Sequence, residues 1–137
     1  HLSAAQPDRQ LVHAGNLLRT HANTLDKLLD ELRADAIGET GAAASGAATQ
    51  VKDIYQPRLR ALRSRMLAEA IDATEPGRKL LAAVDRCLAM TAHFGDIRLR
   101  ELALNQAAAA IHDVEMFISQ YQLENYLREK KYISRHK

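Results

Sequence analysis

Leucine recurs at every seventh position through the first quarter of the chain, at Leu11, Leu18, Leu25 and Leu32. Seven residues make almost two turns of an α-helix, so these side chains share one face. Further residues fill and widen that face: Ala14, Leu17, His21, Leu28, Leu29 and Ala36. A stripe this wide buries more than a two-stranded coiled coil needs. We therefore expect a helix at about 8–37 that faces the core of a bundle formed by this chain.

Three further segments carry apolar residues at helical spacing, and we expect helices at about 49–72, 75–94 and 96–131. Thr49 and Asp96 suit helix starts because their side chains can accept a hydrogen bond from a backbone amide. Thr74 begins a tight corner before Pro76 and Gly77. Pro57 should kink the second helix or restart it. Residues 38–48 are expected to form the main flexible loop.

Composition favours helices over strands. The chain of 137 residues contains only six Gly and three Pro, too few turn signals for a β-sandwich or barrel. We predict one domain over residues 1–137, an all-α, antiparallel up-and-down four-helix bundle with short links between its last three helices. At 1.5 Å per residue the last helix should reach about 50 Å against about 30 Å for the third, and so overhang it.

No pattern of reactive residues points to an enzyme or to a cofactor. A di-iron bundle needs Glu-x-x-His, and no Glu here has a His three residues later. The carboxylates are scattered among basic neighbours, so none stands out as a general acid or base. Cys87 lies in an apolar stripe, where a thiol is usually buried and inert. We expect no catalytic residues, no metal site and no cofactor.

The histidines leave two alternatives open. His112 with Glu115, or His13 with His21, share a helix face and could hold a divalent ion, although solvated or interfacial histidines are more typical. His93 is the nearest candidate for a phosphotransfer histidine. However, Phe94 follows it at an expected helix end, where a histidine is also favoured by the helix dipole.

Basic residues cluster in two places. The second helix carries one group and the chain end another, and both are candidate contacts for an anion or a nucleic acid: Arg58, Arg60, Arg63, Arg65, Arg128, Lys130, Lys131 and Arg135. Such clusters can bind phosphate. They are also common on solvated helix faces, and cations at a helix C-terminus oppose its dipole.

Most aromatic residues lie near the end of the fourth helix. We predict a partner interface there, formed by Phe117, Tyr121, Tyr126, Leu127 and Tyr132. Tyrosine-rich apolar patches near arginine are typical of association surfaces. The alternative is that the long first helix covers these side chains.

The function that these patterns favour is a non-enzymatic interaction or assembly module that self-associates or binds a protein partner. One alternative is a nucleic-acid-binding accessory protein, and another is the ligand-sensing bundle of a larger receptor. With a single cysteine and no apolar stretch long enough to cross a membrane, we expect a cytoplasmic location, and the alternative is an exported protein that is poor in cysteine. Because the first residue is His1, we also expect a trimmed or tagged form of a longer chain.

Overall fold

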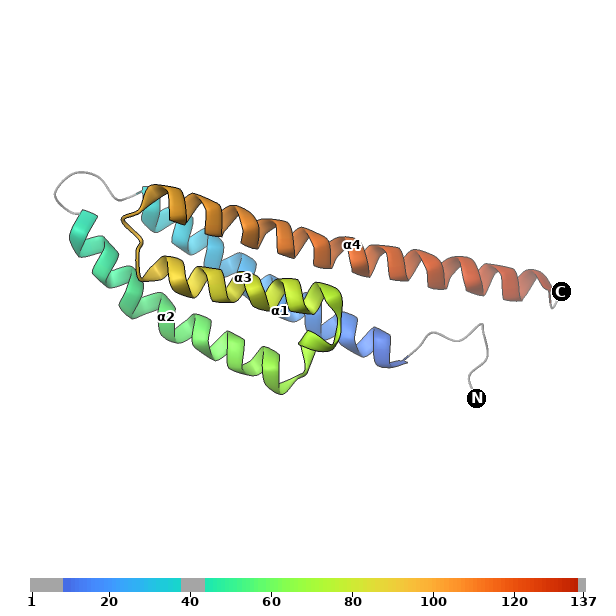
Figure 1. Cartoon of the computed structure of the whole chain (residues 1–137). Helices are drawn as coiled ribbons and strands as arrows, with labels where there is room; N and C mark the ends of the chain where they lie inside the picture. The colour runs from blue at the N-terminus through green and yellow to red at the C-terminus, as the bar shows by residue number, and fades with distance from the viewer. Residues whose placement is uncertain (1–8, 38–43, 136–137) are drawn as a thin grey trace.

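The computed structural model describes the backbone of residues 9–37 and 44–135, and the side chains of residues 13–36, 51–124 and 126–131. These residues form four α-helices that pack together, and no strand occurs among them (Figure 1). The helices are α1 (Arg9–Ile37), α2 (Ala44–Ala68), α3 (Glu75–Thr91) and α4 (Ile97–Arg135), with a short 3₁₀ helix, η2 (Ile71–Ala73), between α2 and α3. The predicted all-helical fold class is confirmed.

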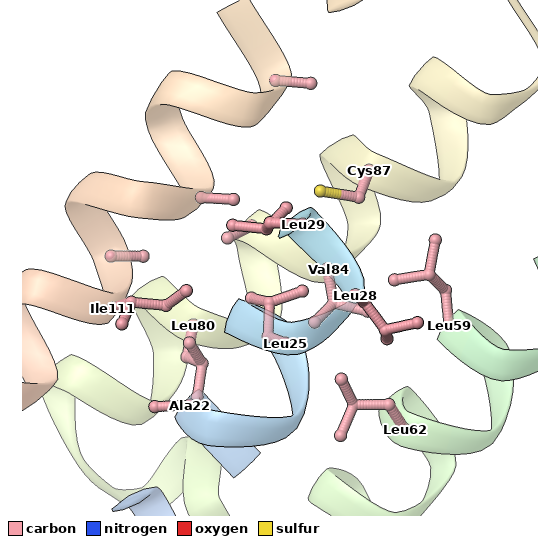
Figure 2. Packing of buried hydrophobic residues seen from close by; sticks show 14 of the residues in the cluster. Ala22, Leu25, Leu28, Leu29, Leu59, Leu62, Leu80, Val84, Cys87 and Ile111 are labelled. Atoms are coloured by element: carbon pink, nitrogen blue, oxygen red, sulfur yellow. The ribbon is translucent and has the colours of Figure 1, made fainter. Parts of the chain in front are cut away.

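The four helices enclose one hydrophobic core. α3 packs against α2 and α4, and α1 packs against the same two helices, whereas α2 and α4 do not contact each other within the described residues. Figure 2 shows Leu25 and Leu29 of α1 among side chains from the other three helices. Leu18, Leu25 and Leu32 are completely buried, so the described part of the seven-residue leucine repeat faces the core, while the side chain of Leu11 lies outside the described residues.

α2 differs from the expected helix at both ends. It begins at Ala44 rather than near Thr49, so part of the small-residue segment expected as loop is helical, while residues 38–43 lie outside the described residues. It ends at Ala68 rather than Asp72, because Ala70 adopts a left-handed conformation (φ 54°) that a helix cannot continue through.

The proline of α2 does not interrupt it. Pro57 lies inside one continuous helix, so the expectation of a fresh start there is wrong. Both Pro57 and Asp53, whose carbonyl loses its helical partner, are exposed, and water can therefore satisfy that carbonyl.

The predicted corner before α3 is confirmed. Thr74 caps α3 by accepting a hydrogen bond from the Gly77 amide at 3.1 Å. Its hydroxyl also donates to the Ile71 carbonyl at 3.1 Å, which joins η2 to the cap. A β-carbon placed on Gly77 would lie only 1.7 Å from the Ile71 oxygen, so this close approach requires glycine.

A second tight connection joins α3 to α4. α3 ends at Thr91, three residues before the expected end, and Asp96 caps α4 through a 3.2 Å hydrogen bond from the Leu99 amide. Buried Arg100 reaches back across the turn, where it donates to the Phe94 carbonyl at 3.0 Å and lies over the Phe94 ring. These contacts hold the start of α4 against the end of α3.

α4 is the longest helix, with 39 residues, and Figure 1 shows its C-terminal part running past the end of α3. Its core-facing side chains follow helical spacing as far as Ile118, the last buried residue among those described. Beyond that point Tyr121 is half-buried and the remaining described side chains are exposed.

Candidate protein interaction surface

Large apolar side chains are exposed on the distal half of α4. Met116, Leu123, Tyr126 and Leu127 keep between 49% and 57% of their surface exposed, and we call these four residues the outer stripe. At about 100° per residue, Met116, Leu123 and Leu127 lie within about 20° of one line along the helix. Buried Val114 and Ile118 lie on the opposite side. α4 therefore presents one apolar face to the core and another away from it.

The outward apolar line also extends toward the start of α4. Leu102 and Ala109 precede Met116 at intervals of seven residues, and both are exposed. A repeat of seven keeps successive side chains on nearly the same line of a helix. Sequence reasoning missed Leu102 and Met116 because it followed the core-facing stripe and the aromatic residues. The seven-residue spacing from Leu102 to Leu123 is the signal that could have found them.

The structure divides the predicted partner interface into two groups. Phe117 is partly buried against the core and Tyr121 is half-buried, because both lie toward the core-facing side of α4. Tyr126 and Leu127 are exposed and belong to the outer stripe. The side chain of Tyr132 lies outside the described residues.

Charged residues flank the outer stripe unevenly. From residue 113 to residue 124 the charged side chains of α4 are all acidic: Asp113, Glu115 and Glu124. From residue 128 to residue 131 they are mainly basic, with Arg128, Lys130 and Lys131 against Glu129. The Lys130 ammonium lies 5.5 Å from the centre of the Tyr126 ring. The distal half of α4 thus has an acidic part followed by a basic part.

The basic residues of α2 do not gather on one face. Arg58 forms two hydrogen bonds with Glu31 of α1, at 2.7 and 3.2 Å, whereas Arg63 contacts Asp85 of α3 at 2.6 Å. The contact between Arg58 and Glu31 lowers the pKa of the Glu31 carboxyl and raises the pKa of the Arg58 guanidinium. Both arginines thus pair with carboxylates inside the chain, on different sides of α2.

The remaining predicted anion contacts are placed as follows. Arg60 is exposed and its guanidinium donates to Gln56 at 3.4 Å. Arg65 is exposed in the last turn of α2. Arg128, Lys130 and Lys131 are exposed on distal α4, and the side chain of Arg135 lies outside the described residues.

The described histidines differ in their exposure to solvent. His21 is buried, and its Nε2 lies 2.8 Å from Glu69 Oε2, so it links α1 to the residue just after α2. His13, His93 and His112 are exposed. Among the described residues no group of three or more His, Cys, Asp or Glu side chains is placed to hold a metal ion.

Cys87 is completely buried in the core, as the sequence predicted. Burial raises the pKa of the Cys87 thiol to about 11, and nearby Arg33 offsets only part of that rise. The thiol is therefore protonated at neutral pH, where it acts as a small apolar side chain rather than as a nucleophile.

Two shallow grooves lie beside α4. One, of about 120 Å³, is lined by residues that include Arg19 and Asn23 of α1 and Glu115 of α4. The other, of about 200 Å³, lies between α3 and α4 and includes Arg86 and Gln106. Ligand pockets usually enclose about 300–1,000 Å³, so both grooves are small for an organic ligand.

Comparisons with known proteins add no relative to this description. No family model matches the chain, and the searches of curated proteins and of solved structures give no match either. None of the described helices combines the length and the apolar character needed to cross a lipid bilayer.

Proposed function

We propose that this chain is a non-enzymatic interaction module that binds a protein surface, belonging to a partner or to a second copy, through the outer stripe of α4. The observation that carries the proposal is the exposure of four large apolar side chains within residues 116–127. Three of them, Met116, Leu123 and Leu127, lie on the side of α4 away from the core, and Tyr126 lies on the flank of the helix, about 100° from Leu127. Completing the burial of a half-exposed Leu or Met contributes on the order of 1 kcal/mol. Four such side chains give a contacting protein a substantial apolar anchor.

We also propose that the scaffold is an antiparallel up-and-down bundle. Two observations support this topology. The connections between α2 and α3 and between α3 and α4 span only residues 69–74 and 92–96, which is too short for a crossover along the bundle. Each helix packs against the next one in the chain, and α1 packs against α4, which closes the ring. The reader can follow the course of the chain in Figure 1.

The outer stripe has stronger support as a contact site than the alternatives have. Binding of nucleic acid through α2 would first have to break the pairs that Arg58 and Arg63 make with Glu31 and Asp85. Neither of the two shallow grooves described beside α4 is large enough for a typical organic ligand, so neither supports a ligand-sensing role.

Site-specific photo-crosslinking in cells tests the proposal. A photoreactive phenylalanine analogue at Tyr126 should yield adducts that contain a second protein chain, because this side chain lies in the outer stripe. The same analogue at Lys52, which is exposed on α2, serves as the matched control, since α2 does not contact α4 within the described residues. Absence of adducts at Tyr126, or equal labelling at both positions, would count against the proposal.

A further inference from the structure

We infer that the occupant of the outer stripe is a second copy of this chain, whose α4 lies antiparallel against the first, with the twofold axis near residues 121 and 122. The inference rests on the proposed function, because it uses the same surface and names what covers it.

The apolar residues of the stripe are self-complementary in this arrangement. A twofold axis between residues 121 and 122 brings Met116 of one copy opposite Leu127 of the other, and each Leu123 lies close to the axis. Exposed apolar side chains near a seven-residue spacing are typical of helices that pack along another helix. Both members of each apolar pair come from the outer stripe, so neither copy needs a second surface.

Charge selects the antiparallel direction. With the same axis, Asp113 and Glu115 of one copy face the basic stretch 128–131 of the other, and symmetry repeats this contact at the opposite end. Asp113 also lies 3.5 Å from Lys79 of α3 in its own chain, an exposed pair that the second copy would share. A parallel pair would instead place Lys130 and Lys131 beside the same residues of the second copy, and like charges at that distance repel. The acidic and basic parts of α4 therefore complement each other only when the helices run in opposite directions.

The contact is short, which sets the expected strength. Residues 113–131 extend over about 27 Å of helix at 1.5 Å per residue. An interface of this length falls at the small end of the range for protein complexes. We expect a weak dimer whose population rises with protein concentration and falls with added salt, because its outer contacts are exposed ion pairs.

Sedimentation equilibrium over a range of protein concentrations tests the inference. The mass should rise from that of one 15.2 kDa chain toward that of two. Leu123→Lys places a charge at the axis and should raise the dissociation constant by about tenfold or more. Ile54→Lys changes an apolar residue of similar exposure on α2, 50% against 57% for Leu123, and should leave the dissociation constant unchanged.

A charge exchange identifies the partner and its direction. The pair Lys130→Glu and Lys131→Glu should weaken the dimer roughly fivefold, since attraction becomes repulsion at both ends. Adding Asp113→Lys and Glu115→Lys restores the complementarity between the copies, so the fourfold variant should recover most of the lost affinity. Recovery is not complete, because Asp113→Lys also replaces the contact with Lys79 of α3 by a repulsion. Circular dichroism of each variant verifies that the bundle remains folded.

The other outcomes overturn the inference. An unaltered chain that stays monomeric at every concentration excludes the second copy, and a fourfold variant that stays as weak as the twofold variant excludes the antiparallel register. If either result accompanies adducts at Tyr126 with a different protein, the proposed function stands and only this choice of occupant fails.

Discussion

Individual polar side chains at the α1–α2 contact each have a carboxylate partner. The Tyr55 hydroxyl donates to Asp35 Oδ2 at 2.6 Å, and buried His21 contacts Glu69. Burial and the bond to Asp35 both raise the pKa of the Tyr55 hydroxyl above its ordinary value. Because a buried polar atom without a partner is costly, these pairs restrict how α1 and α2 fit together.

Burial of Cys87 should make the protein less stable as the pH rises above about 9. The thiol has a pKa of about 11 in the folded protein and an ordinary value of 9.0 when exposed. Between these values the unfolded chain loses the proton while the folded chain keeps it, so the free energy of unfolding should fall as pH rises. Below pH 9 the thiol is protonated in both states, so none of this part of the free energy of unfolding is lost. Two pKa units correspond to at most about 3 kcal/mol.

Urea unfolding at pH 8 and at pH 10.5 measures this effect. The unaltered chain should lose more stability between the two values than Cys87→Ala does, because other groups that titrate, including Tyr55, are common to both. If both proteins lost the same free energy of unfolding between pH 8 and pH 10.5, the buried thiol would not be the cause of the pH dependence.

At the scale of elements, the corner between α2 and α3 is the most tightly constrained connection. Ala70 reverses the chain in a left-handed conformation, η2 follows, and the Thr74 cap starts α3. The close approach of the Ile71 carbonyl to Gly77 joins these pieces. This corner determines where α3 begins and how it lies against α2.

Gly77→Ala should therefore destabilise the protein, by about 1–3 kcal/mol or more, because the added methyl group would meet the Ile71 backbone rather than a movable side chain. Gly95→Ala is the matched control, since nothing lies within 4 Å of a β-carbon at Gly95. Thermal and urea unfolding of both variants measure the two stability changes. Equal stability of the two variants would show that the approach of the Ile71 carbonyl does not require glycine at position 77.

On the scale of the whole molecule, the core and most of the outer stripe occupy different parts of α4, since only Met116 of the stripe precedes Ile118. Described side chains contribute to the core as far as Ile118, whereas the outer stripe extends to Leu127. The bundle and its proposed contact surface should thus be separable. Folding depends on the proximal part of α4, and association on the distal part.

Truncation tests this separation. A chain ending at Gln122 should keep cooperative unfolding, with a stability change of about 1 kcal/mol or less, because it retains every buried residue described. A chain ending at Ala110 should lose most of its stability, since removal of buried Ile111, Val114 and Ile118 costs roughly 1–3 kcal/mol each. Circular dichroism during urea titration reports both results. Similar losses in the two chains would show that the distal helix belongs to the folding unit.

Part of the candidate surface could be predicted from the sequence. The aromatic cluster directed attention to distal α4, where Tyr126 and Leu127 are exposed. A partner interface in this region stays a prediction. Phe117 and Tyr121 were assigned to the same surface, but their exposure depends on how α4 is rotated against its neighbours. A pattern in one segment carries no information about that rotation.

The sequence by itself determined the helical class, the four α-helical segments of the described residues and most of the core, because helical periodicity, caps and tight corners are local properties of the chain. Only the tertiary structure decided which charges are neutralised and which apolar side chains stay exposed. Arg58 pairs with Glu31 of α1, and Arg63 pairs with Asp85 of α3. Met116 and Leu123 remain exposed on the outer side of α4. Pairing and exposure depend on distances between residues far apart in the chain, and those distances arise only when the helices pack.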